Sequence, residues 1–206
     1  MTIKSQIQQI ALTHLSVIQQ RPDHEFLPCI RAKFLYDTLA GYPLIRSHLA
    51  ILTARKVLPI FQKDYSEQKM PARLLRLAER VVAGTLSKES WRIKNYSEVA
   101  YHAGGNGWGF FDDIDYQAYS AGHAASTALS EVCGYEYLNN VPATIICDGK
   151  TLDHTDYHVI APKMDTACHA AHAIAYLDDG GLNPEKLLVF WTWWLTDALK
   201  EAFNCV

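Results

Sequence analysis

The sequence predicts an all-α protein, a single-domain multi-helix bundle with one irregular or short β-hairpin excursion around residues 139–162. Apolar residues recur at helical spacing along most of the chain, which is the main signal for amphipathic helices. Proline and glycine stand at the starts and ends of several such stretches, where helices favour them. A chain of 206 residues is long enough for one sizeable core, so we expect residues 1–206 to form one helical domain.

Four periodic stretches make up the N-terminal part of the chain. Gly41 follows the second and Gly84 the fourth, so both helices are expected to stop there. Pro71 fits the first turn of the fourth. Pro59 should kink or end the third, because proline lacks the N–H that a helix interior needs. The expected helices cover residues 3–20, about 29–40, about 44–61 and 70–84.

Two further helices are expected around a glycine-rich loop in the middle of the chain. Ser87 can cap a helix that carries Trp91 and Val99. The loop "AGGNGWGFFDDID", residues 103–115, lacks the glycine order and the following Lys-Ser or Lys-Thr of a phosphate-binding loop, so it is interpreted as a connector. The helix expected at 113–134 carries His123 on one side. Its other side permits close approach of a second helix through Ala118, Ala121, Gly122, Ala125 and Leu129.

The helix in "MDTACHAAHAIAYLDD", residues 164–179, contains the pattern closest to an enzyme site. At about 100° per residue, Asp165, His169 and His172 fall on one narrow stripe. A carboxylate and two imidazoles on adjacent turns can bind a divalent metal, and "HTDYH" upstream could add ligands. The alternative is an alanine-faced helix that packs inward, with its polar stripe toward solvent or a neighbouring helix. The sequence therefore favours no metal site, and a metal-dependent helical hydrolase is kept as the alternative.

The last expected helix, in residues 190–203, is unusually aromatic. One broad sector of it forms a core face, made of Phe190, Trp191, Trp194, Leu195, Ala198 and Ala202. Trp193 lies across the helix among polar neighbours. It is therefore either held against another helix or displayed at an interface.

Composition excludes several classes of protein. Nineteen basic against twenty-two acidic side chains give a formal charge of −3, without the positive field that most nucleic-acid-binding proteins need. No apolar run reaches the roughly 18 residues of a membrane span. The N-terminus lacks a secretory signal, and five cysteines without a C-x-x-C pair indicate reduced thiols. We therefore expect a cytoplasmic protein that binds neither nucleic acid nor membrane.

The C-terminal stretch "DTACHAAHAIAYLDDGGLNPEKLLVFWTWWLTDALKEAF" resembles the end of a known family. This is an all-helical immunity protein family of bacterial polymorphic toxin systems, the fifth numbered type and its close relatives. The matching features are Asp165, the alanine-rich helix that ends in Ala175 and Tyr176, and the aromatic helix that starts at Phe190. The segments at 54–61, 76–86 and 119–129 resemble the middle helices of the family in the same order, so the resemblance covers roughly residues 45–203.

The resemblance implies a cytoplasmic antitoxin that binds and blocks a cognate toxin domain encoded by a neighbouring gene. The protein would act without catalysis and without a cofactor. Its carboxylates could take the place of phosphates in a basic toxin cleft. The expected partner-binding residues are Trp108, Asp112, Asp113, Asp115, His154, Asp156, Asp178, Asp179 and Trp193. A third hypothesis is a homodimeric helical scaffold, which the small-residue faces and the aromatic helix would also permit.

Overall fold

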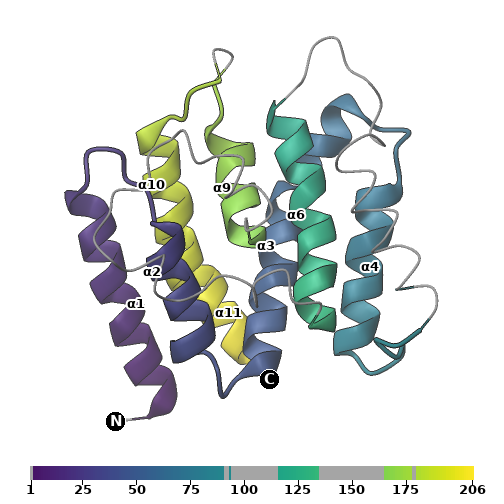
Figure 1. Cartoon of the computed structure of the whole chain (residues 1–206), viewed down its shortest axis with the longest axis horizontal. Helices are drawn as coiled ribbons and strands as arrows, with labels where there is room; N and C mark the ends of the chain where they lie inside the picture. Colours follow the sequence, from purple (N-terminus) through teal and green to yellow (C-terminus); the bar gives the residue numbers. More distant parts are fainter. Residues whose placement is uncertain (1, 91–92, 94–115, 135–164, 178–179) are drawn as a thin grey trace.

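The computed structural model describes residues 2–90, 93, 116–134, 165–177 and 180–206. In these residues the protein is all-α (Figure 1), which confirms the predicted fold class. The excursion at 139–162 and the helix expected after Ser87 lie outside the described residues, apart from Ile93. The helices are α1 (Ile3–Gln20), α2 (Pro28–Lys33), α3 (Pro43–Asp64), α4 (Met70–Val82), α6 (Tyr116–Cys133), α9 (Thr166–Ala175), α10 (Pro184–Trp193) and α11 (Leu199–Asn204). Two π-helical turns, Phe34–Thr38 and Trp194–Ala198, follow α2 and join α10 to α11.

Short sequence signals set the helix ends. The side chains of Thr2, Asp165 and Asn183 each accept a backbone N–H at the N-terminus of α1, α9 and α10. Proline occupies the first turn of α2, α3, α4 and α10, where its missing N–H leaves no hydrogen bond unmade. Gly84 follows α4 with a φ of 68°, a left-handed conformation that favours glycine at a helix end.

The expectation was that Pro59 would kink or end this helix; α3 continues past Pro59 to Asp64, so the proline does not end it. An interior proline costs a helix about 3 kcal/mol because one hydrogen bond is lost. Here Val57 and Phe61, on either side of Pro59, are buried in the core, while Pro59 itself is exposed. Burial of this apolar face stabilises the last turns of α3 enough to offset the cost.

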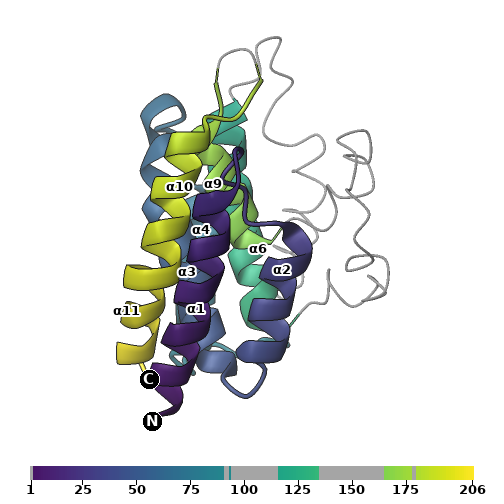
Figure 2. The same ribbon diagram turned by 90° about the vertical axis from the view of Figure 1, so that its left-hand side faces the viewer.

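Three helices form the centre of the bundle. α3 packs against both α6 and α9, and α6 also packs against α9. Figures 1 and 2 show α10 and α11 beside α9 and α3, with α1 at one edge of the molecule and α4 at the other. None of the helices in the described residues is long and apolar enough to cross a membrane.

The small-residue face of α6 lies in the core, as predicted. Ala118, Ala121 and Leu129 are almost completely buried. A Cβ atom at Gly122 would lie only 3.2 Å from Cδ2 of Phe61 in α3. The missing side chain therefore lets α6 approach α3 closely.

The C-terminal aromatic helix provides the largest buried side chains. The core face predicted for residues 190–202 is confirmed, with Trp191 and Trp194 among the largest fully buried groups. Both indoles make edge-to-face contacts with Phe26, at ring-centroid distances of 5.5 and 6.2 Å. Nε1 of Trp194 donates a hydrogen bond of 2.9 Å to Thr53 of α3. These contacts fix the C-terminal helices against the segment between α1 and α2 and against α3.

Candidate functional site

The helices α6 and α9 run antiparallel, and polar and aromatic side chains meet along the seam between them. At one end, Gln117 of α6 donates a 2.6 Å hydrogen bond to the carbonyl of Tyr176, and the rings of Tyr116 and Tyr176 lie 5.4 Å apart. At the other end, Glu131 of α6 contacts Thr166 of α9. Each end of the seam is therefore held by a side-chain contact.

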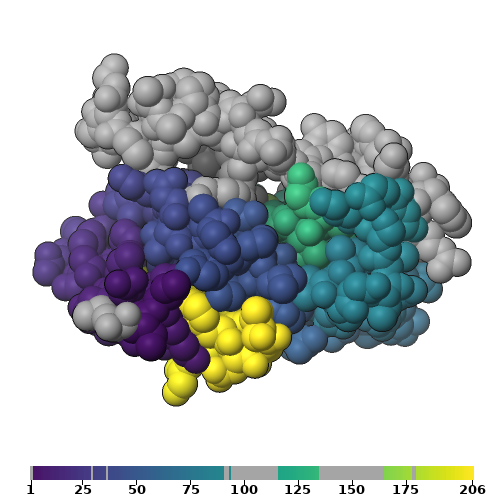
Figure 3. Space-filling view, turned by 90° about the horizontal axis from the view of Figure 1, so that it is seen from below, coloured from purple at the N-terminus to yellow at the C-terminus, as the bar shows by residue number. Residues whose placement is uncertain are grey.

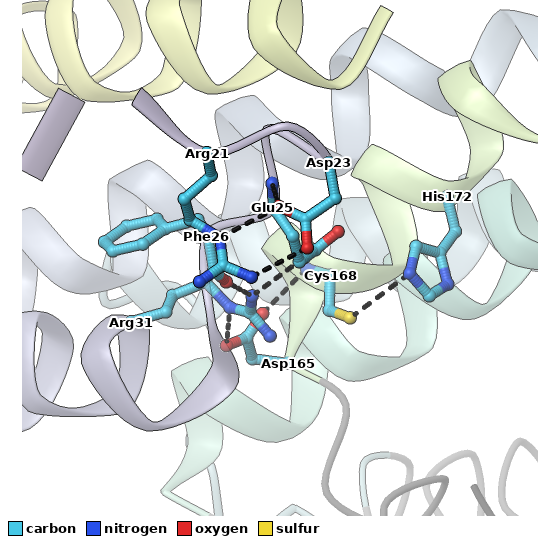
Figure 4. Close-up of polar contacts among 8 residues, drawn as sticks. All are labelled: Arg21, Asp23, Glu25, Phe26, Arg31, Asp165, Cys168 and His172. Atoms are coloured by element: carbon cyan, nitrogen blue, oxygen red, sulfur yellow. Dashed lines mark hydrogen bonds and ion pairs between the residues drawn. The ribbon is translucent and has the colours of Figure 1, made fainter. Parts of the chain in front are cut away.

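A buried ion pair connects α2 to the start of α9 (Figure 4). Nε of Arg31 donates to Oδ2 of Asp165 at 2.5 Å, and Nη1 of Arg31 donates to the carbonyl of Phe26 at 2.6 Å. The side chains of Arg31 and Asp165 are only 1% and 5% exposed. Burial lowers the pKa of Arg31, but Asp165, Cys168 and Glu25 together raise it by more, so the guanidinium stays charged. The pair holds one charge of each sign inside the protein.

Asp165 uses its second carboxylate oxygen to cap α9. Its Oδ1 accepts the backbone N–H of Cys168 at 2.7 Å. One carboxylate thus satisfies a free N–H at the helix start and balances the charge of Arg31. Both oxygens of Asp165 are therefore engaged by the protein's own donors.

Glu25 is a second acid beside this ion pair. Its Oε1 lies 4.0 Å from Nη1 of Arg31, and its side chain is 20% exposed. Burial raises the pKa of Glu25 to about 7, although the charge of Arg31 acts in the opposite direction. Near neutral pH this carboxyl group therefore changes its charge.

Glu131 forms a clasp between the end of α6 and the start of α9. One oxygen, Oε1, accepts both the backbone N–H and the hydroxyl of Thr166, each at 2.8 Å. Burial raises the pKa of Glu131 to about 7, and the nearby charge of Asp165 acts in the same direction. The clasp fixes the two points between which residues 135–164 connect α6 to α9.

The histidines of α9 are enclosed by neighbouring side chains. Nε2 of His172 lies 3.9 Å from Sγ of Cys168, and burial lowers the pKa of His172 to about 4. His169 stacks on His123 of α6 with ring centroids 5.2 Å apart, and burial, followed by His123, lowers its pKa well below the usual value. Burial raises the pKa of the Cys168 thiol to about 12. At neutral pH the side chains of Cys168, His169 and His172 are therefore uncharged.

The three side chains of the alternative metal-binding hypothesis, Asp165, His169 and His172, point to different neighbours in the described residues. Asp165 turns toward Arg31, His172 lies against Cys168, and His169 stacks on α6. Among the described residues, no three such side chains converge on a position that could hold a metal ion. The physical reason is that α9 is buried on nearly all sides, so its polar side chains meet neighbouring helices and not a common point.

Nine residues were predicted to bind the partner. Trp193 lies in the described part of the chain, whereas the other eight lie outside it: Trp108, Asp112, Asp113, Asp115, His154, Asp156, Asp178 and Asp179. The Trp193 side chain is partly buried, with Nζ of Lys56 in α3 lying 4.4 Å from its ring centroid. This favours the expectation that Trp193 is held against another helix.

The roles of Arg31 and Glu131 were not predicted from the sequence. Their partners are 134 and 35 residues away, and no local pattern connects such pairs. The single available signal was Asp165 immediately before an alanine-rich helix, a position typical of an N-cap residue. It indicated the cap but not the arginine.

Comparison with known proteins adds one finding. The model of the family described as Immunity protein Imm5 matches residues 39–201. This range contains α3, α4, α6, α9 and α10 and the first half of α11, but not Arg31. None of the curated proteins matches the chain.

Proposed function

Because the match spans most of its length, the chain belongs to the Imm5 immunity protein family, and we propose that it binds and blocks a cognate toxin domain without catalysis. The family match over residues 39–201 is the observation that carries this proposal. The toxin domain would be encoded by a neighbouring gene, and the immunity protein would meet it in the cytoplasm. Inhibition would result from occlusion of the toxin by a long-lived complex.

The chemistry of α9 supports a binding role. Asp165 is used as a helix cap and as the partner of Arg31, and the buried His172 is neutral at physiological pH. A carboxylate fixed in this way is not available as a general base, and a neutral buried imidazole without a substrate-facing partner is typical of a structural group. These side chains hold the helices in place.

The end of the α6–α9 seam at Gln117 and Tyr176 is a candidate contact surface for the toxin. Tyr116 and Tyr176 lie side by side there, and Tyr116 is 45% exposed. In the sequence, Asp115 immediately precedes Tyr116, and Asp178 follows two residues after Tyr176. Aromatic residues next to carboxylates suit a basic protein surface, because the rings supply buried area and the carboxylates pair with its cations.

A co-expression experiment tests the proposal. The toxin domain of the adjacent gene is expressed in a sensitive host with and without this protein, and the two are then purified together. We expect growth to be rescued and a one-to-one complex to form. Absence of both rescue and complex would refute the pairing.

Charge-removing variants then test the surface. Replacement of Asp112, Asp113 and Asp115 by asparagine should weaken binding by about tenfold or more, as should Trp108→Ala. The matched control replaces Asp37, Asp64 and Asp197, three exposed aspartates of the described chain, by asparagine. Equal affinity of the two triple variants would show that the loop carboxylates make no contact.

The same preparations distinguish the alternatives. A metal-dependent hydrolase should retain near-stoichiometric metal, which His169→Ala combined with His172→Ala should release. A homodimeric scaffold should show a mass that rises with protein concentration in the absence of any other protein. An immunity protein of the proposed kind should retain no metal and keep a constant mass by itself, and it should form a complex only with the toxin.

A further inference from the structure

The outer face of α4 carries a row of cations, which we call the arginine ridge: Lys69, Arg73, Arg76 and Arg80. At about 100° per residue, these four positions fall within a sector of about 60°, and the row is about 16 Å long. All four side chains are exposed, whereas the opposite face of α4, with Leu74, Leu75 and Ala78, is buried in the core. Figure 3 shows α4, in teal, at the outside of the molecule on the side away from α1.

The ridge is unfavourable for α4 by itself. Its neighbours are spaced three or four residues apart, so every adjacent pair along the row repels. Lys69 and Arg73 also stand at the N-terminus of α4, where the helix dipole disfavours positive charge, and the first turn contains no acidic residue. Such an arrangement lowers helix stability and is relieved when anionic groups bind next to it.

In the described part of the chain, acidic side chains do not neutralise the positive charges of the ridge. Glu79, the one acid in α4, pairs with Arg55 of α3 at 2.6 Å. Lys69 donates to the backbone carbonyl of Ser66, and no ion pair to Arg73, Arg76 or Arg80 occurs among the described residues. Three guanidinium groups are thus available on one helix face.

The chemistry of the ridge favours carboxylates of a protein as its ligand. Guanidinium groups bind carboxylates through two parallel hydrogen bonds, and arginine is enriched in protein interfaces while lysine is depleted. A nucleic acid or an anionic membrane is attracted by a broad positive field, but this chain has a net charge of −3. A row of about 16 Å fits a short acidic helix or strand of a partner protein.

We propose that the arginine ridge of α4 docks an acidic segment of the cognate toxin, as a second contact besides the one proposed above for Tyr116 and the neighbouring aspartates Asp115 and Asp178. This inference rests on the proposed function, since the partner is the same toxin. A protein that presents carboxylates at one place and guanidinium groups at another can recognise both signs of charge on its target. A toxin whose charges complement only one of these two surfaces should therefore bind more weakly.

Replacement of Arg73, Arg76 and Arg80 by glutamine tests the ridge. Glutamine keeps a high helix propensity, so α4 should remain folded and its thermal midpoint should stay equal or rise. The matched control replaces Lys33, Lys186 and Lys200, three exposed lysines on other helices, by glutamine and removes the same charge. We expect the ridge variant to bind the toxin domain at least about tenfold more weakly than the control in low salt, chiefly through slower association.

The outcomes separate the two proposals. If the wild-type protein does not bind the toxin domain, the proposed function fails. If the wild type binds and the ridge variant binds as tightly as the lysine control, the ridge inference alone is overturned. A second measurement mixes the wild type with a labelled DNA duplex and with vesicles containing anionic lipid. Binding to either that is lost only in the ridge variant would assign the ridge to that ligand and overturn the inference.

Discussion

Replacement of Arg31 by methionine should strongly destabilise the protein. The substitution removes the 2.5 Å contact to Asp165 and the 2.6 Å hydrogen bond to Phe26, and leaves the Asp165 carboxylate buried without its cation. Breaking a buried ion pair in this way costs about 3–5 kcal/mol of unfolding free energy. Because a domain has only about 5–15 kcal/mol in total, a large share of the stability should be lost.

Urea denaturation followed by tryptophan fluorescence measures this loss. Trp191 is a suitable reporter, because its ring lies 5.4 Å from the guanidinium carbon of Arg31. Arg55→Met is the control: it breaks a pair of similar length whose Arg55 side chain is 58% exposed, so it should cost at most about 1 kcal/mol. Arg31→Met combined with Asp165→Asn should recover part of the loss, since asparagine can still cap α9 without a charge. A loss below about 1 kcal/mol for Arg31→Met would refute the argument that Asp165 is left buried without a counter-charge when Arg31 is removed.

Three further substitutions test separate contacts. Glu131→Gln keeps an oxygen for Thr166 but removes the titrating proton. Burial raises the pKa of Glu131 from 4.5 to about 7, so ionisation of Glu131 lowers the stability of the folded protein as the pH rises through this window. The free energy of unfolding of the variant should therefore exceed that of the wild type by up to about 3 kcal/mol at about pH 8, and by little at about pH 4. Urea titrations at both pH values measure this, and an effect independent of pH would contradict it. Thr53→Val leaves the indole N–H of Trp194 buried without its acceptor and should cost about 1–3 kcal/mol in the same assay, against no change if water replaces the hydroxyl. Gly122→Val pushes a side chain into Phe61 and should lower the unfolding free energy by about 1–3 kcal/mol, whereas an unchanged midpoint would mean that α6 and α3 can move apart freely.

Local signals in the sequence were sufficient for much of the helical framework. α1 was predicted at its observed bounds, and α4 was predicted between Pro71 and Gly84, because amphipathic spacing and helix-end residues agree there. The buried sector of residues 190–202 was also predicted, but its π-helical turn at Trp194–Ala198 was not. A π-helical turn is defined by i→i+5 backbone hydrogen bonds, and an apolar spacing of three or four residues does not distinguish these from the i→i+4 bonds of an α-helix.

The candidate site was predicted less well, because its chemistry depends on contacts between distant segments. Asp165, His169 and His172 share a stripe on an ideal helix, but the partners of that stripe come from α2 and α6. The direction in which the carboxylate of an N-cap residue turns depends on partners outside its own helix. Arg31 decides this, and it lies 134 residues earlier.

The clasp between Glu131 and Thr166 has a consequence for how such a protein can diversify. Its two hydrogen bonds hold the end of α6 to the start of α9. The entropic cost of closing a connection between fixed ends grows slowly, by only about 0.6 kcal/mol for each doubling of its length. By chain closure alone, doubling or halving the number of residues between these two ends would therefore change the free energy of unfolding by less than about 1 kcal/mol, which is compatible with relatives that keep the bundle and differ in the length of this connection.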